Sequence, residues 1–160
     1  MKISEEQARR TAAIVDVNCW FRWGKRVNFT LTLMFRRPEK EDLKFLHDVF
    51  GGRLTEIPQP DGQVFYWYSL QTRVEVLLNA IRPFIQGRSR EVELCFEYYA
   101  SMVAYRKRKM KGKPLAEDEV QRRTSIAQRV VDLNLEWYQL NDPTALTRRE
   151  INAKRRKAMS

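Results

Sequence analysis

Carboxylates are the main side chains with which this chain could perform chemistry. It has only two cysteines, Cys19 and Cys95, far apart in the sequence, and a single histidine, His47. These numbers argue against a zinc finger, a zinc hydrolase and any cysteine or serine nucleophile that needs a histidine base. The sequence contains neither a GxxxxGK(S/T) loop nor a GxGxxG loop, the common phosphate-binding motifs. Any catalysis must therefore come from aspartate and glutamate.

Positive charge is the dominant feature of the composition. The 160 residues include 30 Lys+Arg against 20 Asp+Glu, a formal net charge of +10. Residues 1–102 contribute +2 of this charge, whereas residues 103–160 contribute +8, concentrated in segments 106–113 and 148–157. Such clusters bind polyanions by neutralising phosphates, which supplies affinity but no sequence information. The alternative is a solvated tail that aids solubility.

The length and the 43% of hydrophobic residues predict one domain with a substantial core. No apolar run approaches the roughly 18 residues of a membrane span, and residues 1–6 are too polar for a signal peptide. We therefore expect no membrane partner and an intracellular location, in the cytoplasm or nucleoid, or in an organelle if the gene is encoded there.

A mixture of helices and strands must position the reactive and binding side chains. Ser4 to Gln7 is a capping box that begins the first helix, and residues 72–75 have the same pattern before a later helix. Alternation with a period of two predicts hairpins over 20–35 and 53–69. Helical spacing predicts further helices over 38–50, 72–81, 89–102 and 117–138. We divide the chain into an α/β core (1–105), a basic segment with the C-terminal helix (106–140) and a flexible basic tail (141–160).

The segment Thr11–Cys19, TAAIVDVNC, resembles the LAGLIDADG motif of homing endonucleases. The match covers the small residues, the Ile-Val pair and the first acid, Asp16. Four other segments agree with the family, and the resemblance spans about residues 4–140; these segments are 50–52, 66–68, 82–85 and 91–94. The resemblance implies an α+β, homing-endonuclease-like fold of order α-ββ-α-ββ-α-α, with a four-stranded antiparallel sheet forming a saddle over DNA and a C-terminal helix.

A single copy of the motif implies a homodimer, because in that family the motif helix packs against its counterpart in a second subunit. The small face of the helix would form the seam, through Ala8, Thr11, Ala12 and Val15. The alternative is that this face packs within one subunit. A two-fold dimer favours a near-palindromic target in double-stranded DNA, the preferred partner; structured RNA is the second candidate.

The polar faces of the two hairpins should then form the surface that reads the nucleic acid. By alternation these are Arg22, Asn28, Thr30, Thr32, Arg53, Thr55, Tyr66 and Tyr68. The cations expected to contact phosphates at strand ends and in the later basic turn are Lys25, Arg26, Arg36, Arg88 and Arg90.

The resemblance also predicts a defective catalytic centre. The family uses the second acid of the motif, one from each helix, to hold a divalent metal, usually Mg²⁺, against the scissile phosphates. Asn18 occupies that position, and an amide is a much poorer ligand for a hard dication. Phe35 stands where a polar residue often organises water, and Arg88 where a lysine often follows the Pro-Phe turn. This leaves no assigned catalytic residue, and only Asp16 and Asn18 as candidate metal ligands.

Three functions remain open. The first is nucleic-acid binding by a degenerate dimer that needs no cofactor. The second is a Mg²⁺-dependent endonuclease in which a displaced carboxylate, Asp16 or Glu56, supplies metal ligands. The third is RNA binding, as a maturase-like splicing factor or part of a ribonucleoprotein, in which exposed aromatic residues stack on unpaired bases.

Overall fold

The computed structural model describes residues 2–24, 30–107 and 115–141. The elements are α1 (Glu5–Asn18), β1 (Trp20–Trp23), β2 (Leu31–Arg37), α2 (Glu41–Phe50), β3 (Arg53–Pro58), β4 (Val64–Leu70), α3 (Val74–Ile81), α4 (Ser89–Lys107) and α5 (Glu117–Asn141). This order confirms the predicted α+β fold. The basic run after α4 and the tail, residues 108–114 and 142–160, lie outside the described residues, so the proposed domain division stays a prediction.

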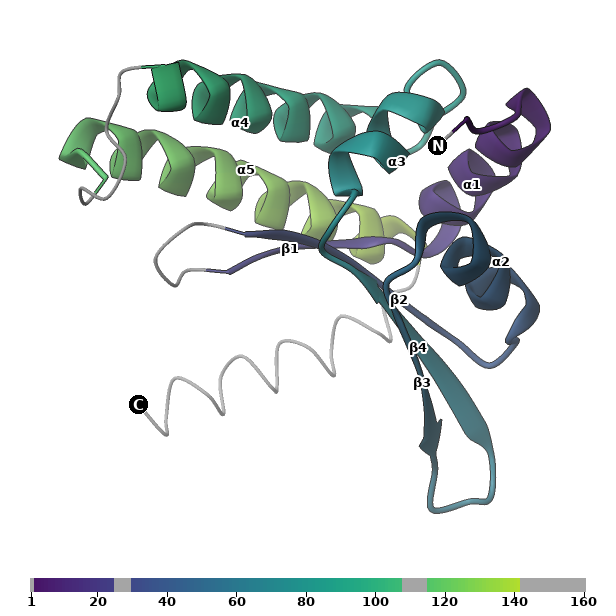
Figure 1. Ribbon diagram of the computed structural model, residues 1–160. Helices are drawn as coiled ribbons and strands as arrows, with labels where there is room; N and C mark the ends of the chain where they lie inside the picture. The colour runs from purple at the N-terminus through teal and green to yellow at the C-terminus, as the bar shows by residue number, and fades with distance from the viewer. Residues whose placement is uncertain (1, 25–29, 108–114, 142–160) are drawn as a thin grey trace.

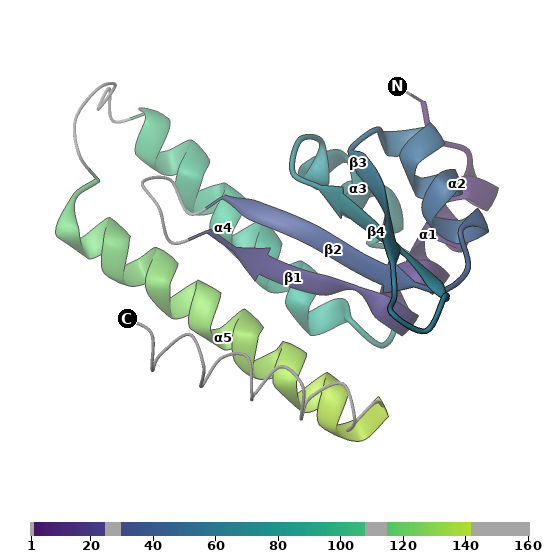
Figure 2. The same cartoon turned by 90° about the horizontal axis from the view of Figure 1, so that it is seen from below.

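The four strands form one antiparallel sheet in the order β1-β2-β4-β3. Helices α1 to α4 lie on one side of the sheet, and α5 runs beside β1 (Figure 1). Seen from below, the strands lie in front of these helices, and none of the described helices crosses them (Figure 2). The sheet therefore has one packed side, which we call the helix side, and one side that no described element covers, which we call the uncovered side.

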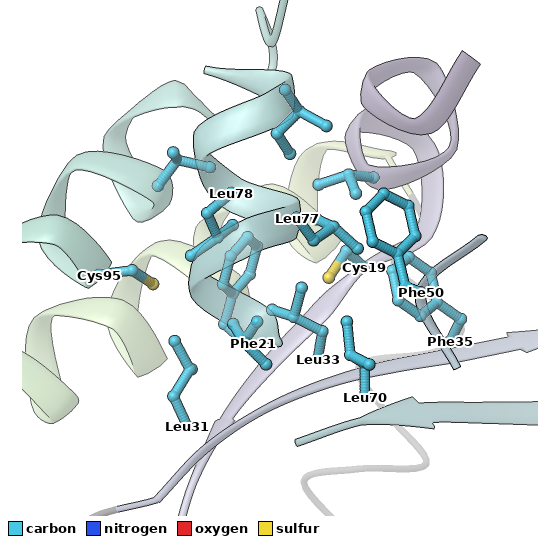
Figure 3. Packing of buried hydrophobic residues seen from close by; sticks show 14 of the residues in the cluster. Cys19, Phe21, Leu31, Leu33, Phe35, Phe50, Leu70, Leu77, Leu78 and Cys95 are labelled. Atoms are coloured by element: carbon cyan, nitrogen blue, oxygen red, sulfur yellow. The ribbon is translucent and has the colours of Figure 1, made fainter. Parts of the chain in front are cut away.

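The hydrophobic core fills the space between the sheet and the helices (Figure 3). The buried strand residues alternate along β1 and β2, as the sequence pattern predicts, and include Phe21, Leu31, Leu33 and Phe35. Each such side chain contributes about 1.5–3 kcal/mol when fully buried. Their helical partners include Phe50, Leu77, Leu78 and Cys95.

The two predicted capping boxes have different outcomes. At α1 the box is present, because the Gln7 amide donates to Ser4 Oγ at 3.1 Å and the Ser4 amide donates to Gln7 Oε1 at 3.0 Å. At α3 the prediction is wrong: the residue before the helix is Arg73, with a left-handed φ of 65°, and its side chain makes no cap bond. A local pattern alone cannot decide between these outcomes, since tertiary packing sets where α3 begins.

Two glycines bring α2 into close contact with the sheet. Gly51 and Gly52 have φ values of 77° and 88°, which L side chains rarely adopt. A Cβ atom on Gly52 would lie 2.6 Å from the Ser69 carbonyl oxygen, so only glycine fits at this crossing. The same crossing lets the Tyr68 hydroxyl donate to the Gly51 carbonyl at 2.8 Å.

The predicted dimer seam is wrong, because its residues are buried within a single chain. Ala8, Thr11, Ala12 and Val15 are at most 5% exposed. Their small side chains permit close packing inside the chain, where α1 contacts α3, and the Thr11 hydroxyl donates to the Gln7 carbonyl at 2.7 Å. The alternative interpretation, packing within one subunit, accounts for this face.

Candidate nucleic-acid interface

Strand register identifies the residues of the uncovered side, because directly opposed residues of antiparallel strands share a face. Across the middle of the sheet, Arg36 pairs with Trp67, which pairs with Thr55. The same rule defines the whole surface, which we call the open face: Trp20, Arg22, Thr32, Met34, Arg36, Arg53, Thr55, Ile57, Phe65, Trp67 and Ser69.

The open face contains part of the predicted reading surface. Five predicted residues lie on it, namely Arg22, Thr32, Arg36, Arg53 and Thr55. Thr30 precedes β2, and its carbonyl accepts the Gly24 amide at 2.9 Å. Lys25, Arg26 and Asn28 lie outside the described residues.

The predicted face of β4 is wrong. Tyr68 is fully buried on the helix side, where burial raises the pKa of its hydroxyl. Tyr66 has the same orientation along the strand and packs against the core. The open face instead carries Phe65, Trp67 and Ser69, which the sequence reasoning missed. Leu70 could have indicated this orientation in the sequence. A leucine in a strand is expected on the core side, and Leu70 lies two and four residues after Tyr68 and Tyr66, so the three share a face.

Electrostatics distinguish the open face from the rest of the described surface. Its three arginines are exposed and form no ion pair with any described residue: Arg22, Arg36 and Arg53. No strand residue of this face is acidic. Elsewhere most described arginines have carboxylate partners, as in Arg9–Glu5 at 2.7 Å and Arg82–Glu93 at 2.7 Å. The free positive charge of the sheet is thus available to an anionic ligand.

Within the described part of a single chain, the residues around the motif do not form a metal site. The Asp16 carboxylate accepts the backbone amides of Gln86 at 3.0 Å and Arg88 at 2.9 Å, so it braces α1 against the start of α4. The Asn18 amide donates to the Arg36 carbonyl at 2.6 Å. Glu56 is on another strand and pairs with Lys40 at 2.6 Å. Within the described ranges, no group of three or more His, Cys, Asp or Glu could hold a metal ion. The donor set therefore does not fit a hard divalent cation.

Arg88 has a buried structural position, so its predicted contact with nucleic acid is wrong. Its side chain is 0% exposed. Nη2 donates to the Cys19 carbonyl at 2.8 Å and to Asn134 Oδ1 at 2.5 Å, and Nε lies 3.0 Å from Glu91 Oε1. Asn134 donates in turn to the Phe21 carbonyl at 2.9 Å. Arg88 and Asn134 together donate hydrogen bonds to the backbone carbonyls of Cys19 and Phe21 along the outer edge of β1. Asn134 thereby attaches α5 to this edge.

Two other predicted positions also lie away from the open face. Phe35 is buried at 2% exposure and packs against Tyr68, with ring centroids 5.7 Å apart. Arg90 is exposed, but it lies on α4, with its Nη1 3.8 Å from Glu136 Oε2. Neither residue can contribute to a site built on the strands.

Neither cysteine is suited to act as a nucleophile. Burial raises the pKa of the Cys19 thiol to about 12, and burial also raises that of Cys95 well above its usual value. A thiol must lose its proton to attack, so both remain inert at neutral pH. The single histidine of the sequence, His47, lies on α2. In the part of the chain that the structure describes, no helix is both long and apolar enough to cross a membrane.

Solved structures that share this architecture include homing endonucleases. The archaeal intron-encoded homing endonuclease I-Vdi141I, complexed with DNA, aligns with a TM-score of 0.57 and 15% identity over 81% of this chain and 84% of that chain. The chain has the homing-endonuclease fold. I-CvuI in complex with its target in the presence of Ca aligns with a TM-score of 0.54 and 12% identity over 81% and 82% of the two chains. I-TnaI gives 0.52 and 13% over 86% and 99%.

Sequence comparison adds nothing to this likeness in fold. No protein-family model matches the chain, and no curated protein sequence is significantly similar to it. I-CvuI has also been solved with a DNA target in the presence of Mg. At identities this low the homing-endonuclease fold is shared without any activity being assigned, because one fold carries many functions.

Proposed function

We propose that this protein binds double-stranded DNA selectively through the open face and does not cut it. The observation that carries the proposal is a sheet face that no described helix covers. It has three arginines that pair with no described carboxylate and no acid among its strand residues, in a fold seen with DNA in its neighbours. Strands of this kind fit the major groove, where arginine binds guanine and threonine or serine hydroxyls contact several bases. The poor fit of Asp16 and Asn18 to a divalent metal supports binding without hydrolysis.

The test is a selection of bound sequences from a random pool of duplex DNA, followed by binding and cleavage assays on the selected duplex. We expect a preferred sequence and affinity that falls steeply with salt, with a slope of about −0.9 for each phosphate contact. We expect no strand scission with Mg²⁺. Scission that a chelator abolishes would refute the non-cutting part of the proposal, and failure to enrich any sequence would refute selectivity.

The proposal includes a homodimer whose seam is the outward face of α1. Helix α1 lies at the periphery of the molecule (Figure 1), and its outward face includes Ala13 and Val17. Val17 is 57% exposed, so its side chain is accessible to a second subunit. This face replaces the buried set that the sequence suggested.

Changing Val17 to Glu should raise the dissociation constant of the dimer at least about a hundredfold. Two like charges would then face each other at the two-fold seam, which costs several kcal/mol. Sedimentation velocity over a dilution series measures the effect. The matched control is Val76→Glu, because Val76 is 41% exposed on α3 and should leave the dimer intact. Equal behaviour of the two variants would contradict this seam.

Changing Asn18 to Asp should not create an endonuclease and should lower the free energy of unfolding by about 1–2 kcal/mol. A carboxylate cannot donate to the Arg36 carbonyl and would place an acceptor against it. Urea unfolding and a plasmid cleavage assay with Mg²⁺ or Mn²⁺ measure the two effects. Asn18→Ala is the control that removes the bond without adding charge. Chelator-sensitive cleavage by Asn18→Asp would show that the remaining site is competent.

Structured RNA is the second candidate ligand, because the open face carries aromatic rings as well as arginines. Phe65 and Trp67 give it surfaces that could stack on unpaired bases. Competition between duplex DNA and a structured RNA of equal length decides between the candidates. Indifference to the RNA competitor would eliminate this function.

A further inference from the structure

We propose that Arg36, Phe65 and Trp67 form a stacking site for a base that has left its duplex. The inference rests on nucleic-acid binding by the open face and adds what part of the ligand this cluster takes. It predicts that the protein prefers a duplex carrying an unpaired base over an uninterrupted duplex.

The three side chains form a compact group on one side of the sheet. Arg36 and Trp67 are directly opposed on β2 and β4, so they share the open face. The Arg36 guanidinium carbon lies 4.6 Å from the centroid of the Phe65 ring. Phe65 and Trp67 are two residues apart on β4, about 7 Å at the usual strand rise. A planar cation and two rings are therefore available within the span of one nucleotide.

The core does not account for these rings. The helix side of the same strands already holds Phe35 and Tyr68, both buried. Phe65 and Trp67 face the other way, and apolar neighbours extend the patch across three strands through Met34 and Ile57. Phe65 and Trp67 are half-buried, so part of each ring remains accessible on this face.

The charge around the patch determines the kind of ligand. Arg22 and Arg53 lie on the same face and form no ion pair with described residues, and no open-face strand residue is acidic. A polyanion with flat apolar groups matches aromatic rings surrounded by cations. The interior of a regular duplex presents base edges, whereas ring stacking needs an exposed base face, which an unpaired base offers.

Asn18 fixes the position of the cluster. Its amide donates to the Arg36 carbonyl at 2.6 Å and so ties the end of α1 to this point of β2. The bond restrains the backbone from which the guanidinium extends over Phe65. The residue that replaces the expected acid of the motif thus acts as a positioning residue for the stacking site.

The experiment compares three fluorescent probes of the same mixed sequence: a 30-base-pair DNA duplex, that duplex with one unpaired 2-aminopurine, and the corresponding bulged RNA duplex. Stacking on aromatic residues is worth about 1–3 kcal/mol per base, so we expect the bulged DNA to bind about tenfold tighter than the regular duplex. The 2-aminopurine fluorescence should be quenched on binding.

The variants separate stacking from general binding and from folding. Trp67→Leu and Phe65→Leu keep apolar volume and should lower the ratio of the affinities for bulged and regular duplex from about ten to about one. Phe84→Leu is the matched control, because Phe84 has an arginine, Arg9, at 4.5 Å from its ring but lies outside the open face. Thermal unfolding confirms that each variant is folded.

Equal affinity of the wild type for bulged and regular DNA would overturn the stacking site while leaving duplex binding intact. Unchanged preference in Trp67→Leu and Phe65→Leu would overturn the assignment to these rings. A preference for bulged RNA only would assign the base to RNA. No binding to any probe would instead refute the proposed function itself.

Discussion

Replacing Arg22, Arg36 and Arg53 together with alanine is expected to weaken binding of the selected DNA duplex at least about a hundredfold. These arginines are the exposed, unpaired cations of the open face. Removing an arginine that binds a base costs about 1–3 kcal/mol, so three such arginines at the lower limit correspond to a factor of about 100. Fluorescence anisotropy at several salt concentrations measures the affinity. The salt slope should also fall by about 1 for each phosphate that the variant no longer neutralises.

A charge-matched control separates local contact from net charge. Arg9, Arg82 and Arg129 already have carboxylate partners, Glu5, Glu93 and Glu97, outside the open face. Replacing these three with alanine removes the same formal charge, and we expect less than about a threefold decrease in affinity, because screened distant charges contribute little. An equal decrease in the two triple variants would mean that DNA binds by overall charge and would contradict the proposed interface.

Replacing Arg88 with methionine is expected to lower the free energy of unfolding by about 3–5 kcal/mol. Removal of one partner of a buried pair leaves the other charge uncompensated, here Glu91 at 3% exposure. The Cys19 carbonyl and the Asn134 amide oxygen are also deprived of their donor. Urea unfolding monitored by tryptophan fluorescence measures the change.

Two further variants test the cause of that destabilisation. Arg90→Met should change the free energy of unfolding by less than about 0.5 kcal/mol, because Arg90 is exposed and its partner Glu136 is 3.8 Å away. Adding Glu91→Leu to Arg88→Met should recover part of the stability, since the uncompensated acid is removed; burial already raises the pKa of Glu91. An Arg88→Met variant as stable as wild type would show that the buried network contributes nothing.

Local signals in the sequence were sufficient to predict the order of elements. The capping box at Ser4, the alternation around Leu31 and Leu33, and the glycines at 51 and 52 each act over a few residues. Such features depend on neighbours in the chain, so they can be read without knowing the packing.

The candidate site was only partly predictable, and β4 shows why. The run Phe65 to Tyr68 has a large ring at every position, so alternation cannot tell its two faces apart. Only the pairing with β2 and the crossing of α2 at Gly52 place Tyr68 inside and Trp67 outside. On β1 and β2, where polar and apolar residues do alternate, Arg22 and Thr32 share the open face, as the alternation predicts.

The sequence by itself determined the fold class and the end of the first helix at Asn18. Tertiary structure alone decided which surfaces those elements present. The small face of α1 suits either a second subunit or its own chain, and contact with α3 settles it. The sequence pattern predicts that Arg88, a cation after a turn, is exposed. In the structure its side chain is enclosed by contacts with Asn134 and Glu91. In each case the packing is decided by residues from elements distant in the sequence. The free energy gained by burial against those elements cannot be inferred from a local sequence pattern.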